Sequence, residues 1–78
     1  MSAESLIEAT VAGHRAWLNV VDNRVEWVTV ECDASVPPSA FAVDEAIHAH
    51  GLVSAVDAAT PHASGEDVVC YAPLGWQP

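Results

Sequence analysis

Two runs rich in β-branched and aromatic residues follow each other in the first half of the chain, and they constrain its fold more than any other feature. They read RAWLNVV (residues 15–21) and RVEWVTVEC (residues 24–32), and only Asp22 and Asn23 separate them. Asp and Asn tolerate the left-handed backbone of a tight turn, so two such runs around this pair are typical of a β-hairpin. The sequence therefore predicts an antiparallel hairpin here.

The register of this hairpin is open between two possibilities. A two-residue turn pairs Val21 with Arg24 and places Trp27 on the same face as Leu18. A three-residue loop shifts the pairing by one residue and places Trp27 beside Trp17. A shift of one residue exchanges the two faces of a strand, so the pattern does not decide which tryptophan lies inside.

The segment before the hairpin, SLIEATVAGH (residues 5–14), supports two interpretations. Ser5 and Glu8 fit the capping box that begins a helix. Apolar side chains at positions 7, 9 and 11 instead alternate with polar ones, as they do in a half-buried strand. We favour the strand, which turns at Ala12-Gly13 and makes a three-stranded meander with the hairpin.

The segment SVPPSAFAVDEAIHAHG (residues 35–51) is the one good helix candidate. Ser39 suits the N-cap position and Gly51 the left-handed position that ends a helix. His48 and His50 do not form a metal site in such a helix, because residues two apart point ~200° away from each other. Imidazole side chains near the carboxyl end of a helix are favoured there in any case.

The second half of the chain predicts two further strands, in LVSAVDAA (residues 52–59) and EDVVCYAPL (residues 66–74), with a loop TPHASG between them. The fold class expected for residues 1–78 is a single α+β domain. It consists of a small antiparallel sheet of four or five strands with one helix packed on one face, in the order β-β-β-α-β-β. The order α-β-β-α-β-β is the alternative.

Acidic residues far outnumber basic ones, with eleven Asp and Glu against two Arg and a formal net charge of -9. They are spread along a chain that is 51% hydrophobic, which indicates a folded domain with an acidic surface. In composition the chain resembles proteins of salt-loving archaea. Salt at ~1 M shortens the Debye length to ~3 Å and so screens the repulsion among these acids. We therefore expect a halophilic, cytoplasmic protein.

The same composition disfavours several classes of partner. Nucleic-acid binding needs Lys and Arg for the phosphates, and two arginines supply too few. No apolar run approaches the ~18 residues of a membrane span, and the first residues lack the features of a signal peptide. We therefore expect neither direct nucleic-acid binding nor a membrane partner.

No motif names a catalytic group or a cofactor. There is no C-x-x-C, so Cys32 and Cys70 are expected to be small buried hydrophobes; their distance from each other stays open. Asp57, His62 and Ser64 are the residue types of a hydrolase triad, but the G-x-S-x-G motif is absent. We therefore expect no enzyme, no metal and no cofactor.

A single helix covers one face of a sheet, which leaves bulky residues of the other face exposed. An exposed apolar patch of this kind normally marks a protein interface. We expect a small non-catalytic interaction or regulatory module, homodimeric or bound to another protein. Its alternatives are an acidic mimic that docks on a basic or nucleic-acid-binding partner, and a small oligomeric enzyme with a site at a subunit junction. The expected interface residues are Trp17, Val21, Trp27, Val28 and Val30.

Overall fold

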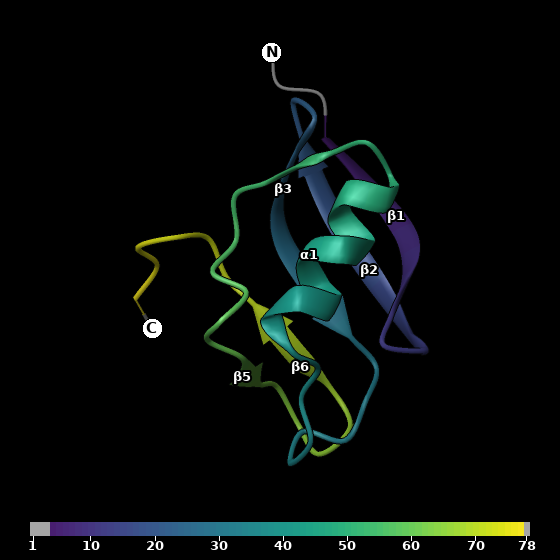
Figure 1. The fold of residues 1–78 in the computed structure, drawn as a ribbon. Coiled ribbons are helices and arrows are strands. Elements are labelled where there is room, and N and C mark those ends of the chain that lie inside the picture. Colours follow the sequence, from purple (N-terminus) through teal and green to yellow (C-terminus); the bar gives the residue numbers. More distant parts are fainter. Residues whose placement is uncertain (1–3, 78) are drawn as a thin grey trace.

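The protein has three long strands, then one helix, then three short strands (Figure 1). The structure is a computed structural model and describes residues 4–77. The long strands and the helix are β1 (Glu4–Val11), β2 (His14–Val21), β3 (Arg24–Val30) and α1 (Ala40–Ala49). The short strands are β4 (Val53–Ser54), β5 (His62–Ala63) and β6 (Val69–Tyr71). The expected α+β class is confirmed, and the first segment is a strand rather than a helix.

All six strands belong to one sheet, whose order along the main path is β1-β2-β3-β6-β5. Two details differ from the expectation. The segment TPHASG, expected to be a loop, contains β5, which pairs with β6. The strand β4 runs parallel to β3, with the Val53 N–H donating to the Asn23 carbonyl at 3.1 Å and the Ala55 N–H to the Val25 carbonyl at 2.9 Å. Both ends of β3 therefore pair with strands from the second half of the chain, the first end with β4 and the last with β6.

Two tight turns hold the first three strands together. Val11 pairs with His14 across Ala12 and Gly13, and Val21 pairs with Arg24 across Asp22 and Asn23. All four central residues have positive φ, between 50° and 82°, as two-residue turns of type I′ require. The two-residue alternative for the second hairpin is therefore confirmed.

A β-bulge in β3 changes the faces that this register predicts. Asn19 pairs with Trp27 and Val20 pairs with Val25, so Glu26 is an extra residue in β3. Unbroken alternation from the turn would place Trp27 on the same face as Val25. The bulge shifts the alternation by one residue, so Trp27 lies on the face opposite α1.

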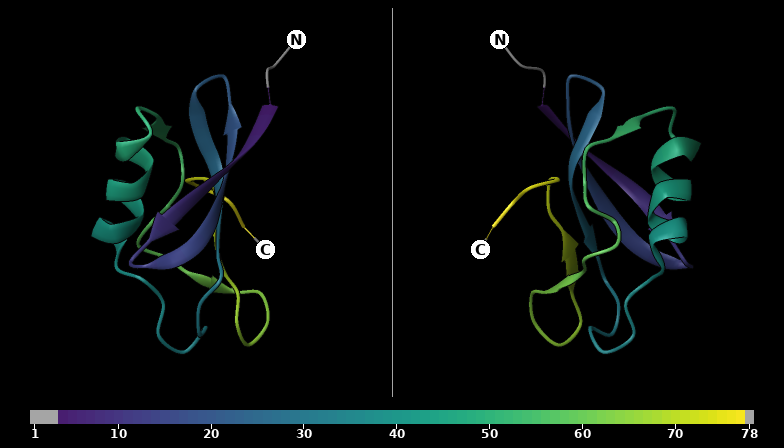
Figure 2. Two further views of the ribbon diagram at one scale, coloured as in Figure 1. Left: turned by 90° about the vertical axis from the view of Figure 1, so that its right-hand side faces the viewer. Right: turned by 60° about the vertical axis from the view of Figure 1, so that its left-hand side comes forward.

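The core lies between α1 and one face of the sheet (Figure 2). The helix contributes Val43, Ala46 and Ile47, which are all buried. Its side chains pack against small and β-branched residues of the strands, which allow helix and sheet to approach closely. The buried strand residues on this face include Ala9, Val11, Ala16, Leu18, Val20, Val25, Val28, Val30, Val69 and Tyr71.

The helix begins and ends where its local sequence predicts. The Ser39 side chain accepts a hydrogen bond from the Ala42 N–H at 3.1 Å, which is the N-cap interaction. At the other end His50 is the C-cap and Gly51 has φ +69°. Ser39 and Gly51 therefore lie just outside the two ends of the helix, as the sequence predicts.

The first turn contains one unfavourable residue. Ala12 has φ 50°, a left-handed conformation that Gly, Asn and Asp adopt readily and that costs an alanine about 1 kcal/mol. Ala12→Asn creates the Asn-Gly pair that type I′ turns prefer. We expect this variant to raise the free energy of unfolding by about 0.5–1 kcal/mol, measured by urea denaturation.

Ala12→Val is the control and should lower the free energy of unfolding, because a β-branched residue fits this backbone worst. Equal stability of the two variants would contradict this account.

Tyr71 ties the end of the sheet to the segment before α1. Its ring is fully buried, and its hydroxyl donates a hydrogen bond to the Pro38 carbonyl at 3.2 Å. Burial, and secondly the charge of a nearby Cys32 thiolate, raise the pKa of Tyr71 to about 12. The folded protein therefore favours the neutral phenol.

This raised pKa predicts a loss of stability at high pH. The unfolded chain releases the Tyr71 proton near pH 10 and the folded chain only near pH 12. The contribution of Tyr71 is therefore complete below pH 10 and is lost as the pH rises towards 12. Burial also raises the pKa of Cys32, which adds a loss that begins near its ordinary value of about 9.

The matched variant is Tyr71→Phe, which keeps the buried ring and removes the titrating group. We expect it to be less stable than wild type by about 1 kcal/mol at neutral pH, because it lacks the hydrogen bond to Pro38. Between pH 10 and 12 its free energy of unfolding should fall less than that of the wild type. Parallel curves for the two proteins, in urea denaturation at a series of pH values, would show that Tyr71 does not cause the loss.

Candidate interaction surface

No helix in the described part of the chain, residues 4–77, covers the sheet face turned away from α1, and we call this face the open face. Figure 2 shows α1 on one side of the sheet and the C-terminal segment on the other. The strand pairing places alternate side chains of every main-path strand on this face, and Trp76 joins them from the C-terminal segment. Its members include Leu6, Glu8, Trp17, Asn19, Val21, Trp27, Thr29, His62, Cys70 and Trp76.

Three aromatic rings form the centre of the open face. The Trp27 and Trp76 rings make an edge-to-face contact with 5.8 Å between their centroids. The His62 ring makes a second edge-to-face contact with Trp76, at 5.1 Å. Trp27 is half-buried as a result, whereas Trp76 keeps 42% of its surface exposed. The C-terminal segment thus covers part of the sheet with an aromatic ring that is itself exposed.

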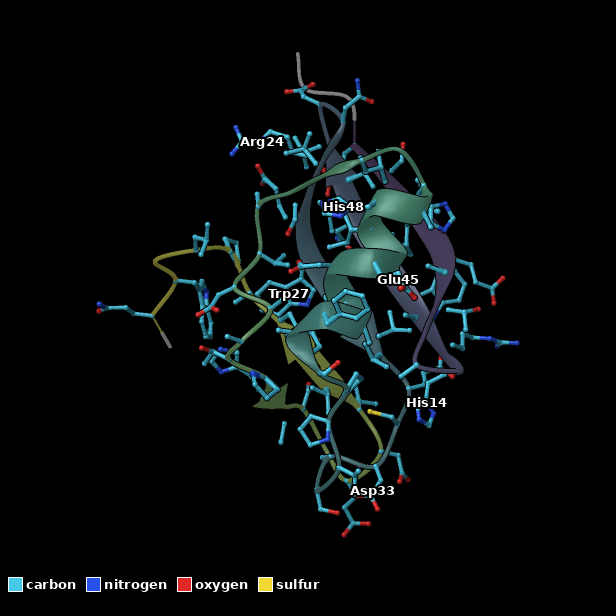
Figure 3. The ribbon with its side chains drawn as sticks, viewed as in Figure 1. His14, Arg24, Trp27, Asp33, Glu45 and His48 are labelled. Carbon is cyan, nitrogen blue, oxygen red and sulfur yellow. The ribbon has the colours of Figure 1, made fainter. Side chains whose placement is uncertain are left out.

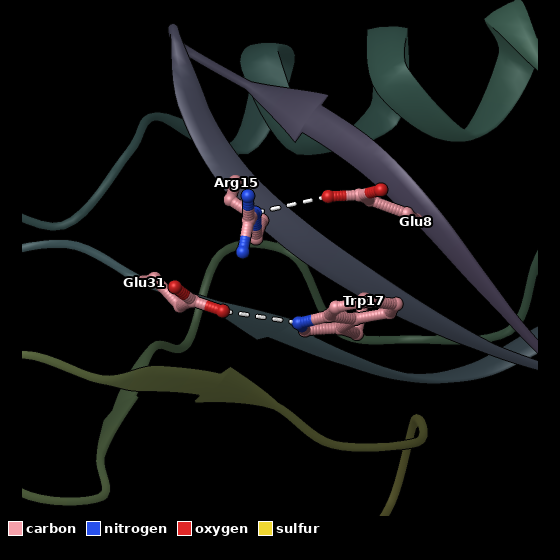
Figure 4. Close-up of polar contacts among 4 residues, drawn as sticks. All are labelled: Glu8, Arg15, Trp17 and Glu31. Atoms are coloured by element: carbon pink, nitrogen blue, oxygen red, sulfur yellow. Dashed lines mark hydrogen bonds and ion pairs between the residues drawn. The ribbon is translucent and has the colours of Figure 1, made fainter.

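Polar contacts hold the other tryptophan of this face (Figure 4). The Trp17 Nε1 atom donates a hydrogen bond to Glu31 Oε2 at 3.0 Å. Beside it, Arg15 Nε and Glu8 Oε2 form an ion pair at 2.9 Å between exposed side chains. Exposed pairs of this kind add little stability, but they fix side chains on the surface of β1 and β2. Trp17 is half-buried, and the hydrogen bond to Glu31 orients its indole ring.

The five residues expected at the interface divide between the two faces. Trp17, Val21 and Trp27 are half-buried on the open face. Val28 and Val30 are fully buried on the helix side, so the prediction that they line the exposed surface is wrong. The bulge at Glu26 is the cause, because it turns Trp27 outward and leaves Val28 inward.

Two members of the aromatic centre were not expected there. Trp76 lies in a tail without periodicity, and His62 lies in a segment that has the composition of a loop. Local patterns contain no signal for a ring that docks on a strand 49 positions earlier in the sequence. Only the content of three tryptophans in so short a chain indicated that aromatic contacts matter.

The histidines lie apart from one another in the described structure. Figure 3 shows His48 on α1 and His14 near the opposite end of the molecule. Among residues 4–77, no group of three or more His, Cys, Asp or Glu side chains is placed to hold a metal ion. Cys32 and Cys70 are both buried and unbridged, and the Cys70 sulfur lies 3.9 Å from the Thr29 hydroxyl.

Acidic side chains gather at the end of the molecule around Asp33. Glu31, Asp33 and Asp67 line a shallow depression together with His14, and Glu66 joins Asp33 and Asp67 around a second one. Hydrogen bonds from the hydroxyl and the backbone N–H of Ser35 lower the pKa of Asp33. This end therefore carries concentrated negative charge, and the open face lies beside it.

Comparisons of the chain with protein-family models, with curated proteins and with solved structures find no match. Within residues 4–77 no helix is long and apolar enough to cross a membrane.

The contact between Trp27 and Trp76 predicts a fluorescence change in a Trp17→Phe background, where fewer tryptophans emit. Trp76→Ala removes the ring that shelters Trp27. Trp76→Phe in the same background is the control, because it keeps an aromatic ring beside Trp27 and also leaves Trp27 as the remaining tryptophan. We expect Trp76→Ala to emit at longer wavelength than Trp76→Phe, and its free energy of unfolding to be lower by about 1–2 kcal/mol. Equal emission maxima of the two variants would show that the segment does not cover Trp27 in solution.

Proposed function

We propose that this protein is a small non-catalytic interaction module that binds a partner protein through the open face. The observation that carries the proposal is the exposed aromatic centre formed by Trp27, Trp76 and His62. Tryptophan rings are enriched at the centres of protein interfaces, because they bury a large area at a small cost in side-chain entropy. A ring that is ordered by neighbours and still exposed is suited to that use.

The surroundings of the aromatic centre support a protein partner over a small ligand. Three surface depressions of the described residues are shallow: one lies on the outer side of α1, one around Asp33, and one reaches only the edge of the open face, at Thr29 and Glu31. A small molecule is normally bound in a deep and largely apolar pocket. The open face instead offers a broad surface with aromatic rings at its centre and charged residues such as Glu8, Arg15 and Glu31 at its rim.

The proposal includes a homodimer in a salt-rich cytoplasm. The formal net charge of -9 repels a second copy in dilute buffer, and salt near 1 M shortens the reach of that repulsion to ~3 Å. The few basic groups are partly engaged with acids, as Arg15 is with Glu8. High salt therefore favours association through apolar and backbone contacts.

The test compares two variants that carry the same change of charge on opposite sides of the molecule. Trp76→Glu alters the open face, and Phe41→Glu alters the outer side of α1, where Phe41 is 74% exposed. Each tagged protein is used to capture partners from the source cells at ~1 M salt, and circular dichroism checks that both variants fold. We expect a partner that binds the wild type and Phe41→Glu and is lost with Trp76→Glu. A partner retained equally by both variants would refute the role of the open face.

A further inference from the structure

The two edges of the sheet differ sharply in length. At one edge, β5 consists of two residues, His62–Ala63. At the other, β1 has eight residues, Glu4–Val11, which pair with β2 without a bulge. Natural sheets usually protect an edge with a short strand, a bulge, proline or lysine. The edge strand β1 is long and has no bulge, proline or lysine, and its charged side chains are Glu4 and Glu8.

The outward groups of β1 can be assigned from the hydrogen bonds of β2. The Arg15 carbonyl accepts a bond from the Glu31 N–H at 2.8 Å, so the backbone of Arg15 faces β3. Its partner in β1, Thr10, is therefore in a non-hydrogen-bonded pair and turns its N–H and carbonyl away from β2. Because these directions alternate along a strand, the backbone N–H and carbonyl groups of Leu6 and Glu8 also point away from β2. Within residues 4–77, β2 is the only strand that pairs with β1.

We propose that β1 pairs antiparallel with β1 of a second copy, so that the homodimer has one sheet continuous through both chains. Outward groups must meet outward groups, which requires the two-fold axis to pass beside a residue of β1 and not between two residues. The axes beside Ile7 and Glu8 pair the most residues of this strand, and those beside Leu6 and Ala9 pair fewer. An axis beside Glu8 sets two Glu8 side chains opposite each other, and an axis beside Leu6 sets Glu4 opposite Glu8. Like charges directly opposite are destabilising.

The axis beside Ile7 avoids both conflicts. It pairs Leu6 with Glu8 of the second copy, Glu4 with Thr10, and Ile7 with Ile7. Ile7 packs against the core but is only partly buried in the single chain, and a second Ile7 would cover it. Charge and burial thus favour the same register, and they favour a second copy of this chain as the occupant of the edge.

The Glu8 side chain is compatible with this pairing. Its carboxylate is bound to Arg15 of its own hairpin at 2.9 Å (Figure 4), which offsets its charge beside the axis. The open faces of the two copies would lie on the same side of the joined sheet. This inference rests on the homodimer of the proposed function but does not require the open face to bind a partner.

The first experiment removes an outward N–H and nothing inward. Leu6→Pro eliminates the Leu6 donor, and an edge strand tolerates proline where the N–H faces outward. Leu6→Ala is the matched control, because it shortens the side chain and keeps the donor. Sedimentation at ~1 M salt should show a dimer for the wild type and for Leu6→Ala. For Leu6→Pro the dissociation constant should rise ~10-fold or more, because symmetry removes the bond twice.

Three outcomes separate the possible errors. A folded Leu6→Pro that dimerises as tightly as the wild type overturns the edge pairing while the homodimer stands. A wild type that stays monomeric at all concentrations overturns both. Loss of the dimer in Leu6→Pro together with native circular dichroism supports the pairing.

A second measurement covers the case in which Leu6→Pro does not fold. In a background with Cys32→Ala and Cys70→Ala, Ile7→Cys should form an intermolecular disulfide on mild oxidation, because non-hydrogen-bonded partners lie close enough for one. Ser5→Cys is the control and should remain monomeric in denaturing electrophoresis, since its opposite residue is Ala9. Equal cross-linking of the two variants, or none in Ile7→Cys, would rule out this register.

Discussion

In residues 4–77 one helix of ten residues covers the sheet on one side, and the other features of the molecule depend on that limit. Val43, Ala46 and Ile47 of α1 close one face into a core of small and β-branched side chains. The opposite face has to be covered by what the strands and the C-terminal segment supply. Trp76 reaches back over Trp27, and Glu31 binds Trp17. The open face is therefore ordered and only partly buried, which is intermediate between a core and an ordinary surface.

The bulge at Glu26 decides how the apolar residues divide between these two faces. With it, the slim side chains of Val28 and Val30 face the helix and the bulky ring of Trp27 faces outward. Without it, the indole of Trp27 would have to fit between the helix and the sheet, where mostly small residues allow close packing. One extra residue in β3 thus both fits the core to a small helix and creates the aromatic centre of the open face.

The open face and the β1 edge are distinct surfaces that use different physical interactions. The open face offers aromatic rings, whose burial yields most of its free energy from the hydrophobic effect. The edge offers backbone donors and acceptors, which give direction and register. Both interactions lie within a molecule that carries nine net negative charges, so salt that screens long-range repulsion favours the two alike. A dimer joined at the edges would present two aromatic centres on one side of a joined sheet.

Local sequence patterns were enough to predict the features that depend on neighbouring residues. Alternation predicted β1, the Asp22-Asn23 pair predicted a turn with positive φ, and Ser39 with Gly51 bounded the helix. These signals are local, because turn and cap residues act on the backbone within a few positions of themselves. The fold class followed from them.

Contacts between distant segments determine which side of the sheet each residue of β3 faces and what covers the open face. The bulge depends on how β2 and β3 pair while Val28 and Val30 pack under α1, which no period in the sequence records. The docking of Trp76 on Trp27 and the parallel pairing of β4 with β3 join segments far apart in the chain. Contacts of that kind are chosen by shape and burial in three dimensions, because many local sequences are compatible with any one of them.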